Sequence, residues 1–132
     1  MRSLGTISRR LNKLVAELQD VFMLKDWHIK VHIKSVLGNR AYADIHPVLK
    51  QARIVIGKDT INRITLLHEL MHIAAANWSH KVAQALESIE DQHRKMVYEK
   101  LVAEEEDVFV EHMAKVLARL PKIDELCKKY GI

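Results

Sequence analysis

The alternation of apolar and polar residues predicts one helix at the start of the chain and several short strands after it. Between residues 7 and 24, apolar side chains recur at the spacing of one helix face, and Ser8 is placed to cap this helix. Three later segments alternate with a period of two, as strands with one buried face do. The alternation predicts strands at 27–34, 41–45 and 51–56, with Pro47 and Gly57 ending the last two.

The rest of the chain has the spacing of helices. Asp59-Thr60 is placed to cap the first of them, which we expect to end near Asn77–Ser79. Pro121 should interrupt the later helical pattern. We therefore expect helices at 80–97 and 98–119, and a short segment at 123–130. One helix, three strands and then helices make an α+β fold, in which a small sheet packs against helices.

Composition indicates a single domain, residues 1–132, without disulfides. A chain of 132 residues that is 48% hydrophobic can bury a core of its own. No apolar run has the length of a membrane span, and the first residues lack the apolar stretch of a secretory signal. Cys127 is the one cysteine, which excludes a disulfide framework and a cysteine-rich zinc ribbon. A reducing, cytoplasmic setting is therefore expected.

The net charge of +4 is unevenly divided along the chain. Residues 1–58 carry 11 Lys and Arg against 4 Asp and Glu, whereas residues 59–132 carry 10 against 13. A basic half can attract nucleic acid or an acidic protein. Its cations are scattered and are not interleaved with aromatic residues, which favours a solvated surface instead. Nucleic acid therefore stays the less favoured partner.

The most specific motif is the run His68-Glu69-Leu70-Met71-His72. Residues i and i+4 share one face of a helix, so both imidazoles can bind one metal ion, and Glu69 then lies beside the water on that ion. Two neutral nitrogens, a nearby base and an open coordination position are what zinc-dependent hydrolysis requires. The alternative is a pair of core histidines on an ordinary buried helix. The apolar, helix-compatible residues around the motif favour the metal site.

A catalytic zinc needs a third protein ligand. The longer zinc signature with a third histidine is not met, because Ala75 and Trp78 occupy the positions of its glycine and histidine. Glu106 is the predicted third ligand, since it falls near the centre of an apolar helix face, where an unpaired carboxylate is costly. The neighbouring acids Glu105 and Asp107 fall at the two edges of that face and remain alternatives.

Histidines outside the motif are rival ligands. His80 would reach the site if the chain turned back after the first of the predicted helices, and His93 is a further candidate. His28 and His32 alternate with the apolar face of their strand, so we expect them to face solvent. An oxyanion could be steadied by Tyr42, by Tyr98 or by one of the histidines without an assigned role, which include His46 and His112. Nothing in the spacing selects among them.

The segments around Trp27, 65–72 and 105–111 resemble the small zincin-like metallopeptidases of phage and bacterial genomes. The similarity covers roughly residues 10–120. It implies a pared-down gluzincin core, with a helix over a short mixed sheet of three or four strands and an edge strand that lines the cleft.

The same resemblance implies Zn²⁺ on His68, His72 and Glu106, with Glu69 as the base. The chain departs from the family in having no recognisable downstream Asp to support a ligand histidine, and no clear specificity domain. It is also similar, more weakly, to SprT-like proteases, which act on proteins attached to DNA. Those proteases use a third histidine, which would favour His80.

Zinc-dependent hydrolysis of peptide bonds is the predicted function. Zinc lowers the pKa of bound water towards about 7, and Glu69 takes the proton and later delivers it to the leaving amine. A protein or peptide substrate would lie along strand 41–45, the expected edge, through backbone hydrogen bonds. Two alternatives remain. One is a zincin-like binding or regulatory module with little catalysis, and the other is a nucleic-acid-associated protease that uses the basic half.

Overall fold

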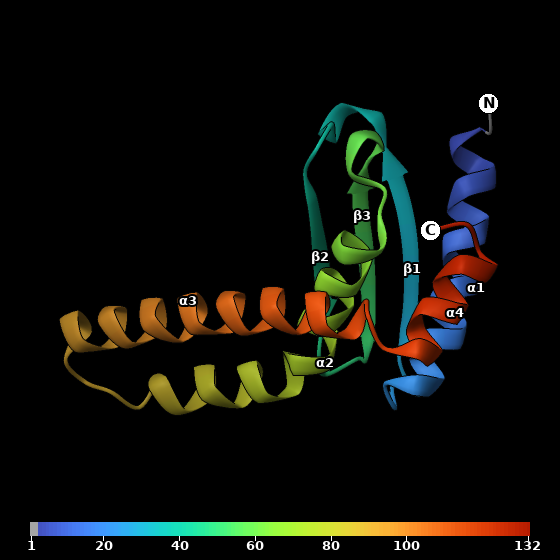
Figure 1. Cartoon of the computed structure of the whole chain (residues 1–132). Coiled ribbons are helices and arrows are strands. Elements are labelled where there is room, and N and C mark those ends of the chain that lie inside the picture. The colour runs from blue at the N-terminus through green and yellow to red at the C-terminus, as the bar shows by residue number, and fades with distance from the viewer. Residues whose placement is uncertain (1–2) are drawn as a thin grey trace.

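A computed structural model describes residues 3–132 and shows an α+β fold of four α-helices and a three-stranded mixed sheet (Figure 1). Two short 3₁₀-helices flank the second and third strands, at Ser35–Leu37 and Lys58–Thr60. The elements follow in the order α1 (Leu4–Val21), β1 (His28–Lys34), β2 (Ala41–His46), β3 (Gln51–Gly57), α2 (Arg63–Leu86), α3 (Gln92–Leu117) and α4 (Pro121–Lys129). The predicted α+β class and the three predicted strands are confirmed.

The sheet has the strand order β1-β3-β2, with β1 parallel and β2 antiparallel to β3. The predicted edge position of the 41–45 strand is therefore confirmed. The other edge, β1, lies against α1, where the Asn12 side chain accepts from the Val31 main-chain N–H at 2.8 Å and donates to its carbonyl at 2.9 Å. Since these two groups are already paired with α1, β2 carries the more accessible edge.

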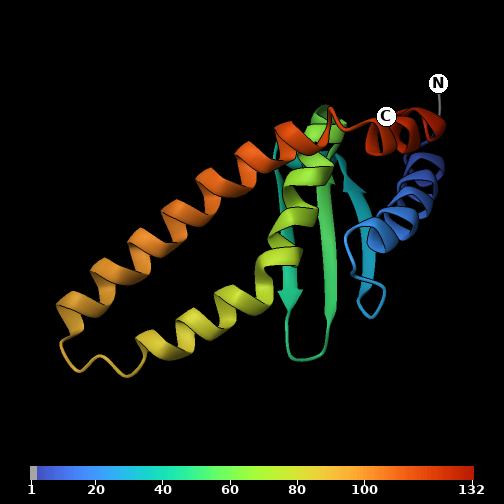
Figure 2. The same cartoon turned by 60° about the horizontal axis from the view of Figure 1, so that its bottom comes forward.

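One face of the sheet is covered by helices. The alternate residues Ile29 and Val31 of β1, and Ile54 and Ile56 of β3, share one buried cluster with residues of α1 and α2. Figure 2 shows α2 crossing in front of the sheet while α1 and α4 lie beside β1. The helix residues at the centre of this core are all fully buried, and they include Leu14, Leu18, Leu66, Leu67 and Leu70. The core therefore anchors the first half of α2 against the sheet.

Both predicted helix caps are wrong. The α1 helix begins at Leu4, because Ser3 accepts from the Thr6 N–H, and Ser8 instead donates its hydroxyl to the Val31 carbonyl. The α2 helix is capped by Asn62, which accepts from the Thr65 N–H at 2.9 Å. Asp59 and Thr60, the predicted cap, form the 3₁₀-helix that precedes it. In each case a different polar residue nearby satisfies the free N–H groups of the first turn.

The predicted helix boundaries after residue 77 are also wrong. The α2 helix does not end near Ser79 but continues to Leu86, and the break lies at 87–91. Asp91 then caps α3 by accepting from the N–H groups of His93 and Arg94. Pro121 does end the helical run, as predicted, but it also begins α4, where its missing N–H is harmless at the first position.

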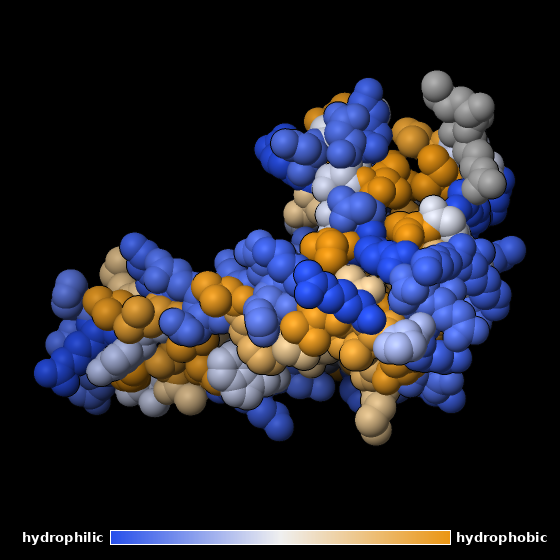
Figure 3. Space-filling model, viewed as in Figure 1, coloured by the Kyte–Doolittle hydropathy of each residue, from blue (hydrophilic) through white to orange (hydrophobic). Residues whose placement is uncertain are grey.

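Beyond the sheet, the second half of α2 and the first half of α3 run side by side as a helical arm, residues 77–105 (Figures 1 and 2). No residue between Ala76 and Val110 is buried. Figure 3 shows apolar side chains scattered along this projection, and the exposed ones include Trp78, Met96, Val97, Tyr98 and Leu101. Among the helices within residues 3–132, none combines the length and apolar character of a membrane-spanning segment.

Candidate metal centre

The two motif histidines lie on one face of α2 and point at each other. Leu66, Leu67 and Leu70 pack into the core from the opposite side of the helix, which leaves His68 and His72 facing β2 and α3. Their ring centroids are 4.9 Å apart at an interplanar angle of 64°, and their Nε2 atoms are separated by 3.2 Å. The motif spacing thus brings two nitrogen donors to one point, as the i, i+4 relation predicts.

Asp107, in α3, supplies an oxygen at the same point. Its Oδ1 lies 3.4 Å from His72 Nε2, and one ligand atom each from His68, His72 and Asp107 lies within 4.8 Å of the others. The Asp107 side chain is 70% exposed, whereas that of His72 is only 20% exposed. The cluster therefore has two shielded nitrogens and one carboxylate at its open side.

The spacing of these atoms suits a tetrahedral zinc ion. Zinc binds histidine nitrogen and carboxylate oxygen at about 2.0–2.2 Å, which places neighbouring ligand atoms about 3.3–3.5 Å apart. The 3.2 Å between the two nitrogens and the 3.4 Å between nitrogen and oxygen are close to that separation. The residues therefore fit a zinc ion in donor type and in number, and two of the three separations match; the third, from His68 to Asp107, lies within 4.8 Å.

Glu106 contacts the other nitrogen of the His72 ring. Its Oε1 lies 3.3 Å from His72 Nδ1, and its Oε2 accepts a hydrogen bond of 2.7 Å from the Ser79 hydroxyl. When Nδ1 carries the proton and donates it to Glu106, Nε2 keeps its lone pair for a metal. Glu106 is shielded, as predicted, but the atom of His72 that it touches is the one that points away from His68. This geometry is that of a carboxylate supporting a ligand histidine.

The electrostatics favour the neutral form of His68. Burial lowers the pKa of His68, and the nearby His72 lowers it further, while the charges of Asp107 and Glu111 act in the opposite direction. A metal ligand must be the neutral imidazole, so this shift favours the state that binds a cation.

Glu69 is the one buried charged residue among those that the structure describes, with 7% of its surface exposed. Burial is the main cause that raises the pKa of the Glu69 carboxyl, and the negative charge of Asp107 adds to the rise. His72 acts in the opposite direction. A carboxylate that holds its proton more tightly is a stronger base, which is the property a general base needs near neutral pH.

His68, His72, Asp107 and Glu69 border one open hollow between β2 and the two helices. Its volume is about 400 Å³, and Ala41, Ala43 and Ile45 of β2 form its wall opposite the helices. The remaining lining residues are Tyr42, His68, Glu69, His72 and Asp107. The edge strand therefore borders the space in front of the histidine pair.

The rival ligands are not brought to this cluster. Because α2 continues without a turn, His80 lies eight residues beyond His72, a rise of about 12 Å along the helix axis. His93 lies in the first turn of α3, at the far end of the arm. His28 and His32 are exposed on β1, as predicted. Of the two predicted tyrosines, Tyr42 is among the residues at the hollow, but its side chain alternates with those of Ala41 and Ala43 and so lies on the other face of the sheet, whereas Tyr98 lies on the arm.

The sequence favours Glu106 over Asp107 because the centre of an apolar helix face is the more costly place for an unpaired acid. In the structure Glu106, at the centre of that face, lies beside Nδ1 of the His72 ring. Asp107, at the edge of the face, lies beside Nε2. Which acid reaches Nε2 depends on the direction in which α3 crosses α2, and the helical wheel of α3 alone gives no information about that direction.

Comparisons with known proteins give no relative. No protein-family model matches the chain, and neither the curated proteins nor the solved structures include a significant match.

Proposed function

We propose that this protein is a zinc-dependent peptidase, with His68, His72 and Asp107 as metal ligands. The observation that carries the proposal is the convergence of two Nε2 atoms and one carboxylate oxygen beside a buried Glu69. The chemistry of these residues, two imidazoles and an acid with a separate base in one hollow, is that of a hydrolytic site. Glu106 orients the His72 ring through its Nδ1, and Ser79 in turn donates a hydrogen bond to Glu106.

The residues of the chain have separate roles in this proposal. A zinc ion, when bound, polarises a carbonyl and lowers the pKa of a water molecule. Glu69 accepts the proton of the attacking water and passes it to the nitrogen of the leaving amine. His72 keeps one orientation because Glu106 engages its Nδ1. The low exposure of Glu69 limits its hydration, which keeps it available for this proton.

We further propose that the substrate peptide lies along β2. This strand is at the edge of the sheet and borders the hollow, so its outer backbone groups are placed to pair with an added strand. Such pairing would bring one peptide bond of the substrate in front of the histidine pair. We also propose a cytoplasmic setting, which the free, buried thiol of Cys127 supports.

The first test replaces Glu69 with Gln in the full chain. We expect Glu69→Gln to keep one bound zinc per molecule and to lose about 10²–10⁴-fold in turnover, because general-base catalysis contributes that much. Fluorescently labelled, unfolded casein and a random peptide mixture serve as substrates, with zinc measured by mass spectrometry. Glu104→Gln, the same chemical change at an exposed position of α3, is the control and should keep full activity.

Full activity in Glu69→Gln would reject the mechanism. Stoichiometric zinc with no cleavage by the wild-type protein would reject the peptidase and favour the zincin-like binding module instead. Absence of zinc binding would reject both.

A further inference from the structure

One face of the sheet packs against the helices, and the opposite face is polar and is not covered by any helix that the structure describes. The strand register places its residues in three rows, each crossing all three strands. We call this surface the reverse face. Its rows are His28–Gln51–His46, Lys30–Arg53–Asp44 and His32–Val55–Tyr42, and Lys34 extends the β1 side.

The reverse face carries more cations than acids, and the excess lies on β1. Lys30, Lys34 and Arg53 are exposed and cationic, whereas Asp44 is the one acid in the three rows. Asp44 is already engaged, since it lies 3.7 Å from Arg53 and 3.6 Å from the imidazole of His46. Lys30 stands directly beside Arg53 in the register, and like charges in that position disfavour the sheet. A bound polyanion would relieve this repulsion.

Flat rings flank the cationic row on both sides. His28 and His46 stand in the row before it, and His32 and Tyr42 stand in the row after it. Alternate residues on a strand are about 7 Å apart, so rings and cations alternate across the face at that interval. All four ring residues are exposed, and the first row and the cationic row border a shallow hollow of about 180 Å³.

Interleaved rings and cations fit one class of anion best. Every nucleic-acid base has a face that stacks on a ring, and each phosphate between bases needs a cation. A single strand can present its bases to a flat sheet, whereas the bases of a duplex are already stacked on each other. A membrane surface would instead need apolar side chains to insert, and the three rows contain only the buried Val55.

We propose that the reverse face binds single-stranded nucleic acid. The proposal does not depend on the metal centre, because no proposed zinc ligand lies on this face. The two sites are joined through β2, whose successive residues Ala43 and Asp44 border the hollow of the metal centre and the reverse face respectively. A bound strand would keep the hollow close to proteins that associate with nucleic acid.

The test measures binding of a fluorescein-labelled oligothymidine of about 20 nucleotides to the full chain by fluorescence anisotropy. We expect affinity to fall with salt, with a slope near −2 in log–log form, because about three phosphates are neutralised at about 0.7 each. Lys30→Glu/Lys34→Glu should weaken binding at least tenfold and make the slope shallower by more than one. His32→Ala should weaken binding without changing the slope, because it removes stacking rather than charge.

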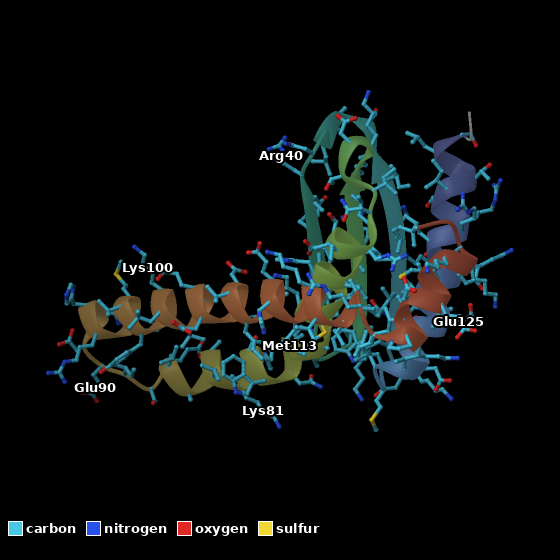
Figure 4. The ribbon with its side chains drawn as sticks, in the orientation of Figure 1. Arg40, Lys81, Glu90, Lys100, Met113 and Glu125 are labelled. Atoms are coloured by element: carbon cyan, nitrogen blue, oxygen red, sulfur yellow. The ribbon has the colours of Figure 1, made fainter. Side chains whose placement is uncertain are left out.

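The matched control is Lys81→Glu/Lys100→Glu, on the arm (Figure 4). Both double variants lower the net charge from +4 to zero, so a surface-specific site requires that only the reverse-face variant loses affinity. Ultraviolet crosslinking of the wild-type complex gives a second readout, with crosslinked peptides expected from β1 and β2. This readout holds even where a charge-reversal variant fails to fold.

Three outcomes would overturn the proposal. Equal losses in both double variants would mean diffuse attraction by net charge. Equal affinity for a duplex of the same length would remove the single-strand assignment. Binding to vesicles that contain about 30% phosphatidylserine, without binding to the oligonucleotide, would make this a membrane-binding face. None of these results bears on zinc binding or peptide cleavage, so the two proposals fail separately.

Discussion

At the scale of single residues, Glu106 and Asp107 occupy different positions around the His72 ring. The two acids are adjacent in α3, yet they approach different nitrogens of the same imidazole. Successive residues on a helix point about 100° apart, so a helix that crosses the His72 ring presents one acid to each of its sides. The sequence predicts that Glu106 of this run is the ligand, whereas in the structure Asp107 lies beside the nitrogen of His72 that faces His68.

The adjacent acids give a sharp prediction about zinc affinity. Asp107→Asn should abolish stoichiometric zinc binding, because it removes the one carboxylate among the three proposed zinc ligands. Glu106→Gln should keep the zinc but weaken its affinity about 10–100-fold, since it alters a group that only orients His72. Competition with a fluorescent zinc chelator measures both affinities.

Glu105→Gln is the control for both variants, because Glu105 is the next acid along and contacts neither histidine ring. Its zinc affinity should equal that of the wild type. The reverse order, with zinc lost in Glu106→Gln and kept in Asp107→Asn, would restore Glu106 as the ligand and reject the assignment made from this structure.

At the scale of elements, the strands were predictable and the helix boundaries were not. Residues in β1 alternate strictly because one face of the strand is buried and the other is exposed. Apolar and polar residues therefore alternate in the sequence as well. In the arm no such contrast exists, because no residue from 77 to 109 is buried. Apolar spacing therefore carries little information there, and the break at 87–91 is marked only by the cap at Asp91.

The arm should be the least stable part of the helical structure. Helices gain most of their stability from packing an apolar face, and the arm packs only along the seam between α2 and α3. We expect backbone amides of residues 80–100 to exchange with solvent at least about tenfold faster than those of 66–73, through local opening. Hydrogen exchange followed by mass spectrometry or NMR measures this difference directly.

The inner half of α2 is the internal reference for this measurement, since Leu66, Leu67 and Leu70 are fully buried. Equal protection along the whole of α2 would show that the arm unfolds only together with the core. That result would contradict the reasoning from burial.

At the scale of the whole molecule, Arg63 holds the ends of three helices together. It lies in the first turn of α2, pairs with Asp124 in α4, and donates to the carbonyl of Ala118, the residue that caps the end of α3. It also donates to the main-chain oxygen of Ile132 at 2.9 Å. These contacts connect segments that are 55–69 residues apart, which no local pattern in the sequence predicts.

The Arg63 contact makes stability depend on pH in a defined window. The hydrogen bond from Arg63, and then the one from Lys128, lowers the pKa of the Asp124 carboxyl below its usual 3.8. A lowered pKa in the folded state stabilises the protein above about pH 3.8, and this contribution disappears as the pH falls through the folded-state pKa. We expect Asp124→Asn to be less stable than the wild type near pH 7 and to match it in strong acid. Urea unfolding at several pH values measures the difference.

The control is Glu125→Gln, which removes the next carboxylate in the same helix at an exposed position (Figure 4). It should leave the free energy of unfolding almost unchanged at neutral pH. A difference between Asp124→Asn and the wild type that stayed constant down to acid pH would mean that the loss comes from packing and not from the ion pair.

The strand order also belongs to this scale, and it explains why the reverse face was not predicted. Each strand shows in its own sequence that one side is polar, but the sequence does not say that β3 lies between β1 and β2. Only the pairing puts Lys30 beside Arg53 and sets the rings of three strands into rows. Cations that are scattered along residues 28–53 thereby become one surface.

The contact between Asn12 and the backbone of Val31 has a further consequence for solubility. Sheets that are open on both sides can stack edge to edge without limit, which is how fibrils grow. Here the β1 edge is already paired with a side chain of α1. Strand addition therefore stops once the β2 edges of two molecules have paired with each other. Removing that amide would free the Val31 N–H to pair with another strand, while Ser8 would still donate to the Val31 carbonyl.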